Sequence, residues 1–210
     1  MSFQWIIDNC EALSITSLKQ ASTTTARDGT IRTTSRGFLP RQFEVQMPDG
    51  MPWDSNRSYI LAAEKLDRTT QTTFKINNAG QNWFIGYQGS YTNLTGYGGA
   101  IVTATITQAS STITITASGA LASGFKFRAG DYIQLGASGN VYQVAADVAF
   151  NSNTLTLDRP VREASGSGVS IFVAQYCTFK VICTSFPKWN IFARNQIGWN
   201  GPFVFAEVLV

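Results

Sequence analysis

The sequence predicts a mainly β protein in which a small β-barrel is inserted into a β-sandwich with one helix. Three observations lead to this fold class. Short segments alternate between apolar and polar residues, and turn residues separate them. A Gly-rich segment, QGSYTNLTGYGG at residues 88–99, divides the chain. Beyond residue 175 the chain returns to long apolar segments, which we expect to complete the first module.

The first module begins with an ambiguous segment and then a predicted hairpin. Residues 5–7, WII, fit either a short strand or an apolar arm. In TTTARDGTIRTTSR, Asp28 and Gly29 lie between Thr-rich flanks. These two residue types accept the positive φ angles of a type I′ turn, so we expect a tight hairpin here.

A half-buried strand and the only clear helix follow the hairpin. Strict alternation in RQFEVQM predicts that Phe43, Val45 and Met47 face the core. The segment PDGMPWDSNRSYILAAEKLDR predicts a helix near residues 55–67, with Asp54 or Ser55 as its N-cap. The expected apolar stripe of this helix comprises Tyr59, Ala62, Ala63 and Leu66.

The remaining strands fall into two groups. Residues 73–76 and 83–87 return to strand before the Gly-rich segment. Evenly spaced short strands beyond it predict a small barrel at residues 93–174. Its expected strands are residues 101–106, 112–116, 131–135, 141–145, 154–157 and 169–174. Residues 177–184 and 203–210 are the apolar strands that return to the first module, so the predicted domains are 1–92 with 175–210, and 93–174.

Composition excludes several classes of function. The 210-residue chain has no histidine, which removes Ser-His and Cys-His nucleophile pairs and His-containing metal sites. Its three cysteines form no CxxC motif, and we expect buried free thiols. No apolar run is long enough to cross a membrane, and no secretory signal is recognisable, so we expect assembly in the cytoplasm. Charged residues make up only 14%, which fits either surface hidden in an assembly or a Thr-rich β protein.

The search for chemistry leaves only weak candidates. Ser185-Phe-Pro-Lys188 has the S-x-x-K spacing, but Pro187 argues against the helix that would align its ends. The carboxylates are scattered; Glu64 and Glu163 would be the first to test in an unrecognised hydrolase. We therefore expect no enzymatic activity, no cofactor and no metal.

Aromatic and basic residues suggest binding alternatives. Tyr132 and Tyr142 could carry carbohydrate on an OB-type barrel, or they could simply fill its core. A basic groove for nucleic acid is not apparent. Arg27, Arg32, Arg36 and Arg41 gather around the predicted hairpin, where we interpret them as solvated or subunit-pairing residues.

Several segments together resemble a known family. The stretch AGDYIQLGASGNVYQVAADVAFNSNTLTLDRPV, residues 129–161, resembles a segment of tail proteins from long-tailed bacteriophages. TARDGTIRTTSRGFLPRQFEVQMP and the helix after it are similar to the N-terminal part of distal tail (Dit) proteins, and WNIFARNQIGWNGPFVFAEVLV looks like their closing strands. The first 14 residues have no clear counterpart and could be an arm that reaches a neighbouring subunit.

The resemblance implies a structural virion protein of the tail tip or baseplate. Distal tail proteins form a ring, commonly a hexamer, that joins the tail tube to the hub and the receptor-binding apparatus. A β-sandwich with one helix makes the ring, and an OB-like barrel is inserted in it. The implied partners are further copies of the chain, the tube protein and the hub protein. We expect Arg27, Arg32 and Arg36 at the subunit interface. The alternative is a carbohydrate-binding module of a tail tip or fibre.

Overall fold

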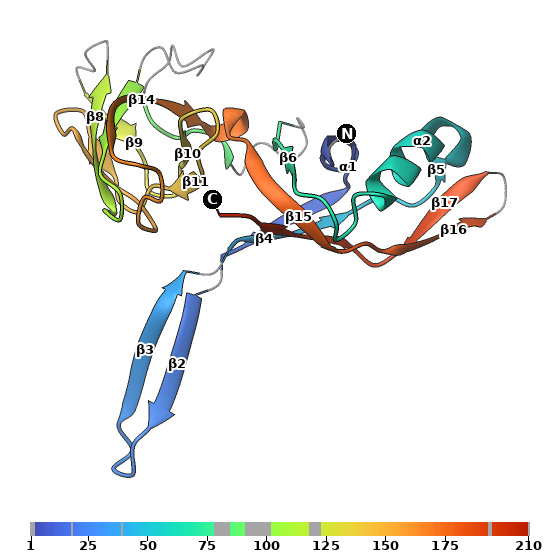
Figure 1. Ribbon diagram of the computed structural model, residues 1–210, viewed down its shortest axis with the longest axis horizontal. Helices are drawn as coiled ribbons and strands as arrows, with labels where there is room; N and C mark the ends of the chain where they lie inside the picture. The colour runs from blue at the N-terminus through green and yellow to red at the C-terminus, as the bar shows by residue number, and fades with distance from the viewer. Residues whose placement is uncertain are drawn as a thin grey trace. The chain divides into compact units, whose positions relative to one another are not determined.

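The computed structural model describes residues 3–17, 19–38, 40–77, 85–90, 102–117, 123–192 and 195–209. For residues 19–21 and 32–38 it describes the backbone alone. The described chain is mainly β, as the sequence predicts, and it contains two α-helices (Figure 1). Its strands form several separate sheets.

The chain divides into two compact units. Unit 1 comprises Met1–Thr72 and Val181–Leu209, and unit 2 comprises Thr73–Lys180. Unit 2 is therefore inserted in the sequence of unit 1, and it begins earlier and ends later than the 93–174 segment proposed from sequence. No helix among the described residues is long and apolar enough to cross a bilayer.

A five-stranded sheet lies mainly in unit 1. Its strands are β1 (Ala12–Thr16), β4 (Gln42–Gln46), β18 (Phe203–Glu207), β15 (Phe179–Ser185) and β6 (Thr72–Phe74), in that order across the sheet. The alternation in β4 is confirmed, because Phe43, Val45 and Met47 are at most 1% exposed. Phe43 lies opposite Phe205 of β18, so the end of the chain does pair with its early part.

A second, smaller sheet of unit 1 was not anticipated. It contains β16 (Lys188–Phe192), β17 (Gln196–Asn200) and β5 (Met51–Pro52), in that order. Trp53 and Trp189 stack here with ring centroids 4.8 Å apart. The residues of β16 and β17 do alternate between polar and apolar types, but each run is short, and only the alternation of β17 follows burial.

The N-terminal segment is neither a strand nor an arm. Residues 4–8 form α1 (Gln4–Asp8), and Phe3, Ile6 and Ile7 are fully buried. The ring of Phe3 contacts Phe205 at a centroid distance of 4.9 Å. Because these apolar residues fill the core of their own unit, the proposal that they reach another subunit is wrong.

The predicted helix is present, but its details differ. Helix α2 spans Trp53–Glu64, and Pro52 holds the N-cap position in place of Asp54 or Ser55. Ile60 and Ala63 are buried, whereas Tyr59 of the expected stripe is 52% exposed. The apolar face is therefore turned by about one residue from the predicted one.

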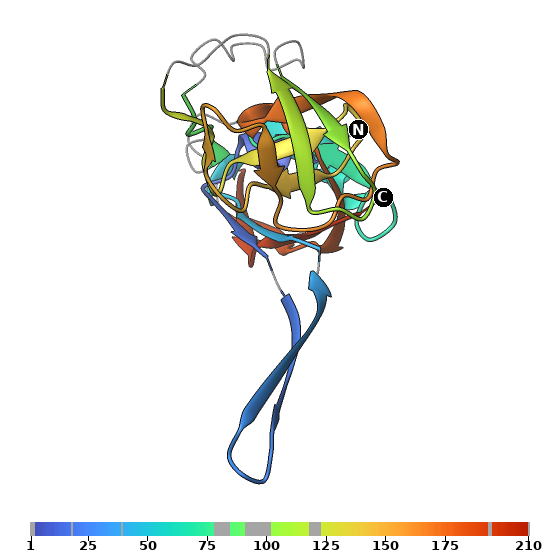
Figure 2. The same ribbon diagram turned by 90° about the vertical axis from the view of Figure 1, so that its left-hand side faces the viewer.

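The predicted hairpin is confirmed, with a wider turn. Strands β2 (Lys19–Thr25) and β3 (Ile31–Phe38) pair along their length, with Thr25 opposite Ile31. Gly29 has φ +83°, but Asp28 does not adopt a positive φ, so the turn is not type I′. The Ala26 amide instead donates to the Thr30 carbonyl oxygen at 2.8 Å. Among the described strands, β2 and β3 pair only with each other, as Figure 2 also shows.

The described part of unit 2 contains eight strands that lie wholly within it. Its six-stranded sheet has the order β11 (Val141–Gln143), β10 (Tyr132–Leu135), β14 (Gly166–Val173), β7 (Val102–Ile106), β8 (Thr112–Ala117) and β13 (Thr154–Thr156). β9 (Phe125–Phe127) pairs separately with β12 (Val148–Ala149), and a turn at Ala174–Tyr176 follows β14. A bridge from Val144 to Leu157 connects the ends of the outermost strands β11 and β13.

Some predicted segments lie outside the described residues. These are residues 83 and 84 of the expected strand 83–87, residues 91–99 of the Gly-rich segment, and Ile101 at the start of the expected strand 101–106. Residues 85–87, which the structure does describe, form no strand.

Candidate functional site

Exposed apolar side chains are distributed unevenly between the two units. The exposed large apolar residues in the described chain are Ile31 (65%), Tyr59 (52%), Leu61 (37%), Phe150 (40%), Ile191 (47%) and Phe192 (43%). All but Phe150 belong to unit 1. Single exposed apolar residues are normal, but neighbouring ones indicate a surface that another molecule covers. Unit 1 is therefore the better candidate for an interaction surface.

Unit 1 also contains strands with an unpaired edge. Among the described strands, β16 is the outermost strand of its sheet, and the β2–β3 hairpin pairs with nothing else. An outermost strand presents N–H and C=O groups that another chain can bind. β16 combines this edge with two adjacent exposed apolar residues, Ile191 and Phe192.

The outermost strands of unit 2, by contrast, are joined to each other. The Ala145 amide donates to Thr156 and the Asp158 amide donates to Gln143, both at 2.8 Å, next to the Val144–Leu157 bridge. The side chain of Asp158 also accepts from the amide of Gln143 at 2.9 Å. Backbone groups at these edges are thus used within the unit.

The three candidate interface arginines all lie in the β2–β3 hairpin. Arg27 is exposed in the turn, beside Asp28, whose Oδ1 accepts from the Thr30 amide at 2.9 Å. This hydrogen bond lowers the pKa of Asp28. Arg32 lies opposite Thr24, and Arg36 lies at a bulge in β3. The side chains of Arg32 and Arg36 lie outside the described residues.

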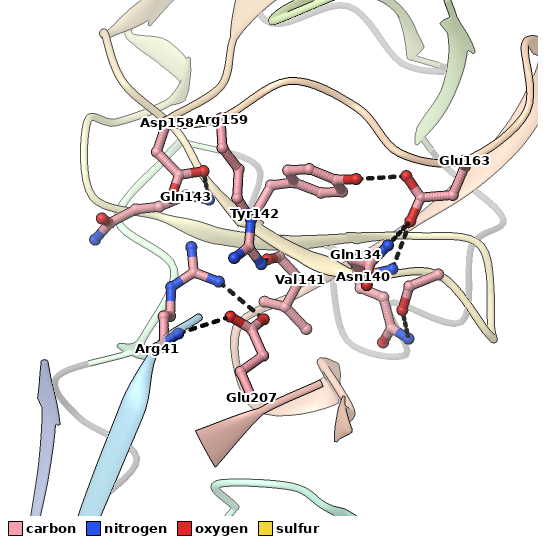
Figure 3. Close-up of polar contacts among 11 residues, drawn as sticks. Arg41, Gln134, Asn140, Val141, Tyr142, Gln143, Asp158, Arg159, Glu163 and Glu207 are labelled. Atoms are coloured by element: carbon pink, nitrogen blue, oxygen red, sulfur yellow. Dashed lines mark hydrogen bonds and ion pairs between the residues drawn. The ribbon is translucent and has the colours of Figure 1, made fainter. Parts of the chain in front are cut away.

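Arg41 is not a surface residue, contrary to its sequence interpretation. Its side chain is 1% exposed and its Nη1 lies 3.3 Å from Oε1 of Glu207, as Figure 3 shows. The Arg41 amide donates to the other carboxylate oxygen at 3.2 Å. A buried cation needs a buried anion; here the pair ties the start of β4 to the end of β18.

The barrel aromatics proposed as a carbohydrate platform are inside unit 2. Tyr132 is 7% exposed and Tyr142 is fully buried, so neither offers an open ring face. The hydroxyl of Tyr142 donates to Glu163 at 2.5 Å and accepts from the Arg162 amide at 2.9 Å (Figure 3). Burial, and then the hydrogen bond to Glu163, raises the pKa of Tyr142. Of the two alternatives left open by the sequence, the structure agrees with the one in which these tyrosines fill the core of unit 2.

Glu163 is engaged in the same network and is not a free catalytic group. Its Oε1 accepts from the Asn140 amide at 2.5 Å and from the Asn140 side chain at 2.9 Å. Tyr142 contacts its other oxygen. The carboxylate thus holds the turn between β10 and β11 against the segment that precedes β14.

Asp131 fixes its turn by accepting hydrogen bonds from backbone amides. Its carboxylate accepts from the Arg128 amide at 2.8 Å and from the Gln88 amide at 2.9 Å. The residue is 1% exposed, and this burial raises the pKa of its carboxyl despite both hydrogen bonds. Through these contacts Asp131 stabilises the fold of unit 2.

Glu64, the other hydrolase candidate, lines an open hollow of 440 Å³ in unit 1 together with Asp67, Lys188 and Trp189. Asp67 lies 3.3 Å from the Arg68 guanidinium. Burial, and then the Asp67 carboxylate, raises the pKa of the Cys183 thiol to about 12. A thiol with this pKa stays protonated at neutral pH and is a poor nucleophile.

The cysteines, the S-x-x-K segment and the acidic residues are the remaining candidates for a reactive or metal-binding site. Cys10, Cys177 and Cys183 are buried free thiols, as predicted. Ser185 ends β15 and Lys188 begins β16, so the S-x-x-K spacing does not lie on a helix. Within the part of the chain that the structure describes, no group of three or more His, Cys, Asp or Glu residues could hold a metal ion.

Comparison with known proteins adds no assignment. No protein-family model matches the chain, and a search of curated proteins finds no match. The function must therefore be argued from the surface of unit 1 and the sequence features above.

Proposed function

We propose that this protein is a non-catalytic structural subunit that assembles into a closed homomeric ring through unit 1. The resemblance of its segments to distal tail proteins supports a position for this ring at the tail tip or baseplate of a long-tailed bacteriophage. There it would join the tail tube to the hub and the receptor-binding apparatus. A hexamer is the expected stoichiometry.

One observation carries the proposal: the interaction-prone surface is concentrated in unit 1. Five of the six exposed large apolar residues of the described chain belong to this unit, as do the unpaired edges of β16 and of the β2–β3 hairpin. A homomeric ring needs two different complementary surfaces on each subunit, because its contacts are heterologous. The hairpin with Arg27 and the β16 edge are two such different surfaces.

Unit 2 suits the part of an inserted OB-like barrel. Its six-stranded sheet has outermost strands connected by the Val144–Leu157 bridge, and its core is continuous from Val102 to Ala174. A sheet that closes on itself leaves few edges for uncontrolled pairing. In this proposal unit 1 makes the contacts between ring subunits, and unit 2 is available to bind other tail proteins.

The test is the mass of the purified chain in solution by light scattering, with negative-stain images of the same material. We expect rings with a central opening. A chain that stays monomeric both alone and when mixed with its tube and hub partners would contradict the proposal.

Charge reversal then tests the hairpin arginines. Substituting Arg27, Arg32 and Arg36 by Glu should weaken the ring while leaving the circular dichroism spectrum unchanged. The matched control is Arg162→Glu in unit 2, which should leave the ring intact. An unaffected ring in the triple variant would remove these arginines from the interface.

A further inference from the structure

The β2–β3 hairpin needs a partner that its own described chain does not supply. Its strands pair only with each other, and residues 22–25 and 27–31 are exposed. An isolated two-stranded hairpin is at best marginally stable in water. Its outer edges carry N–H and C=O groups along seven residues of β2 and eight of β3. A third strand would satisfy these groups.

β16 offers the complementary edge. Its five residues pair with β17 on one side only, from Lys188 opposite Asn200 to Phe192 opposite Gln196. In an antiparallel pair, alternate residues direct their backbone groups away from the partner strand. Ile191 and Phe192 add apolar surface that is nearly half exposed. Natural proteins usually protect such an edge with charge, proline or a covering element.

We propose that the hairpin of one copy binds the β16 edge of the next copy, so that β2–β3 and β16–β17–β5 form one continuous sheet across the subunit boundary. This inference rests on the proposed ring and names the surface that accepts the hairpin. Main-chain hydrogen bonds would supply the attraction, as in strand addition generally. Contacts of Ile191 and Phe192 with the hairpin would bury the exposed apolar surface.

The residues of the two elements favour this pairing over other contacts. The hairpin is rich in Thr, a residue that suits a pleated and partly exposed surface. The exposed face of α2, with Tyr59 and Leu61, cannot supply strand hydrogen bonds. β1 is also an outermost strand, but none of its residues is an exposed large apolar one. Because the hairpin and β16 are different surfaces, the contact can repeat around a ring.

The first experiment compares assembly of two variants at matched concentrations. Ile191→Lys/Phe192→Lys places two charges on the β16 edge, and both positions are exposed enough to leave the core intact. The control is Phe150→Lys, an equally exposed residue of unit 2. We expect the β16 variant to weaken association on the order of tenfold or more, and the control to match the original chain.

The second experiment tests whether the hairpin is the element that binds the β16 edge. Chains carrying Thr24→Cys are mixed with chains carrying Ile191→Cys, and disulfide formation is followed under mild oxidation. The three native thiols are buried and give little background. The mixture should form a crosslinked heterodimer. Thr24→Cys mixed with Phe150→Cys should not.

The outcomes separate this inference from the proposed ring. If the ring forms and the β16 variant assembles as well as the original chain, the inference is wrong and the ring stands. Efficient crosslinking of Ile191→Cys chains to each other would also overturn it, because β16 would then pair with β16. A chain that forms no oligomer with itself or on its tail partners would overturn both.

Discussion

The two units place their unsatisfied groups differently. In unit 2, the outermost strands bond to each other and the acidic side chains Asp131 and Glu163 accept backbone hydrogen bonds inside the unit. In unit 1, strand edges and apolar side chains are left at the surface. The difference shows that a sequence with few charged residues need not expose interaction surface in every unit. One unit can be closed while the other is left to complete its contacts in an assembly.

The largest expected effect is the loss of folding stability when the buried Arg41–Glu207 ion pair of unit 1 is broken. Glu207→Gln leaves the Arg41 cation buried without its carboxylate, which typically costs about 3–5 kcal/mol. Urea unfolding monitored by tryptophan fluorescence measures the loss. Four of the five tryptophans belong to unit 1 and only Trp83 to unit 2, so this signal reports mainly on unit 1.

The double variant Arg41→Met/Glu207→Leu is the control for that prediction. Replacing both charges with apolar groups removes the uncompensated cation and should recover most of the lost stability. Equal destabilisation of the single and double variants would show that the pair acts through packing and not through charge.

A smaller effect is expected in unit 2 from Glu163→Ala. The substitution removes the acceptor of three hydrogen bonds from Asn140 and Tyr142. Each buried donor left unpaired costs about 1–3 kcal/mol, although water that enters reduces the sum. Pulsed alkylation should label Cys177 of unit 2 faster, with Cys10 and Cys183 unchanged. Simultaneous exposure of all three thiols would mean that the units unfold as one.

The loss of folding stability at alkaline pH should be smaller than the effect of Glu163→Ala, and part of it should come from Cys183 in unit 1. The pKa of Cys183 is about 12 in the folded chain, above the roughly 8.5 of a free thiol. The folded state therefore retains the proton longer, and the resulting stability is complete below about pH 8.5 and lost as the pH rises toward 12. At pH 10 the loss is at most about 2 kcal/mol. Cys183→Val should flatten the pH dependence of urea unfolding, and an unchanged slope would contradict the assignment.

The smallest expected effect is that of surface variants. Leu61→Ser removes an exposed side chain from α2 and should change stability by about 0.5 kcal/mol, whereas Tyr59→Ser also loses the stacking on Trp5 at a centroid distance of 5.6 Å and should cost about 1 kcal/mol. Thermal unfolding measures this. A loss above about 2 kcal/mol would show that the surface of unit 1 is already engaged within the chain.

The sequence predicts well those elements whose periodicity follows from one-sided burial. Strand β4 alternates because one face meets the core, and the strands of unit 2 are separated by clear turn residues such as Gly130 and Gly136, both with positive φ. The Asp-Gly pair predicts the hairpin, but the five-residue turn depends on the Ala26–Thr30 hydrogen bond.

Features that depend on distant partners could not be predicted. Arg41 looks like its neighbouring surface arginines until Glu207, 166 residues away, is placed beside it. Tyr142 is buried because Glu163 accepts its hydroxyl proton. Strand β16 alternates between polar and apolar residues from Lys188 to Ile191, but Ile191 and Phe192 are both exposed, so this alternation does not follow burial. Exposed apolar residues at an edge break the pattern on which sequence interpretation depends.

The split of unit 1 around unit 2 also sets an order of synthesis. Unit 2 is continuous in sequence and can fold while the ribosome is still at work, because domains generally fold as units during translation. Unit 1 cannot fold at that stage, because β4 pairs with β18, which is translated later. The edge strand β16 begins only at Lys188. The hairpin is translated before unit 2, but the strand proposed to receive it is translated only after unit 2. Under the proposed contact, association of neighbouring nascent chains on one messenger RNA is thereby delayed until unit 2 has been made.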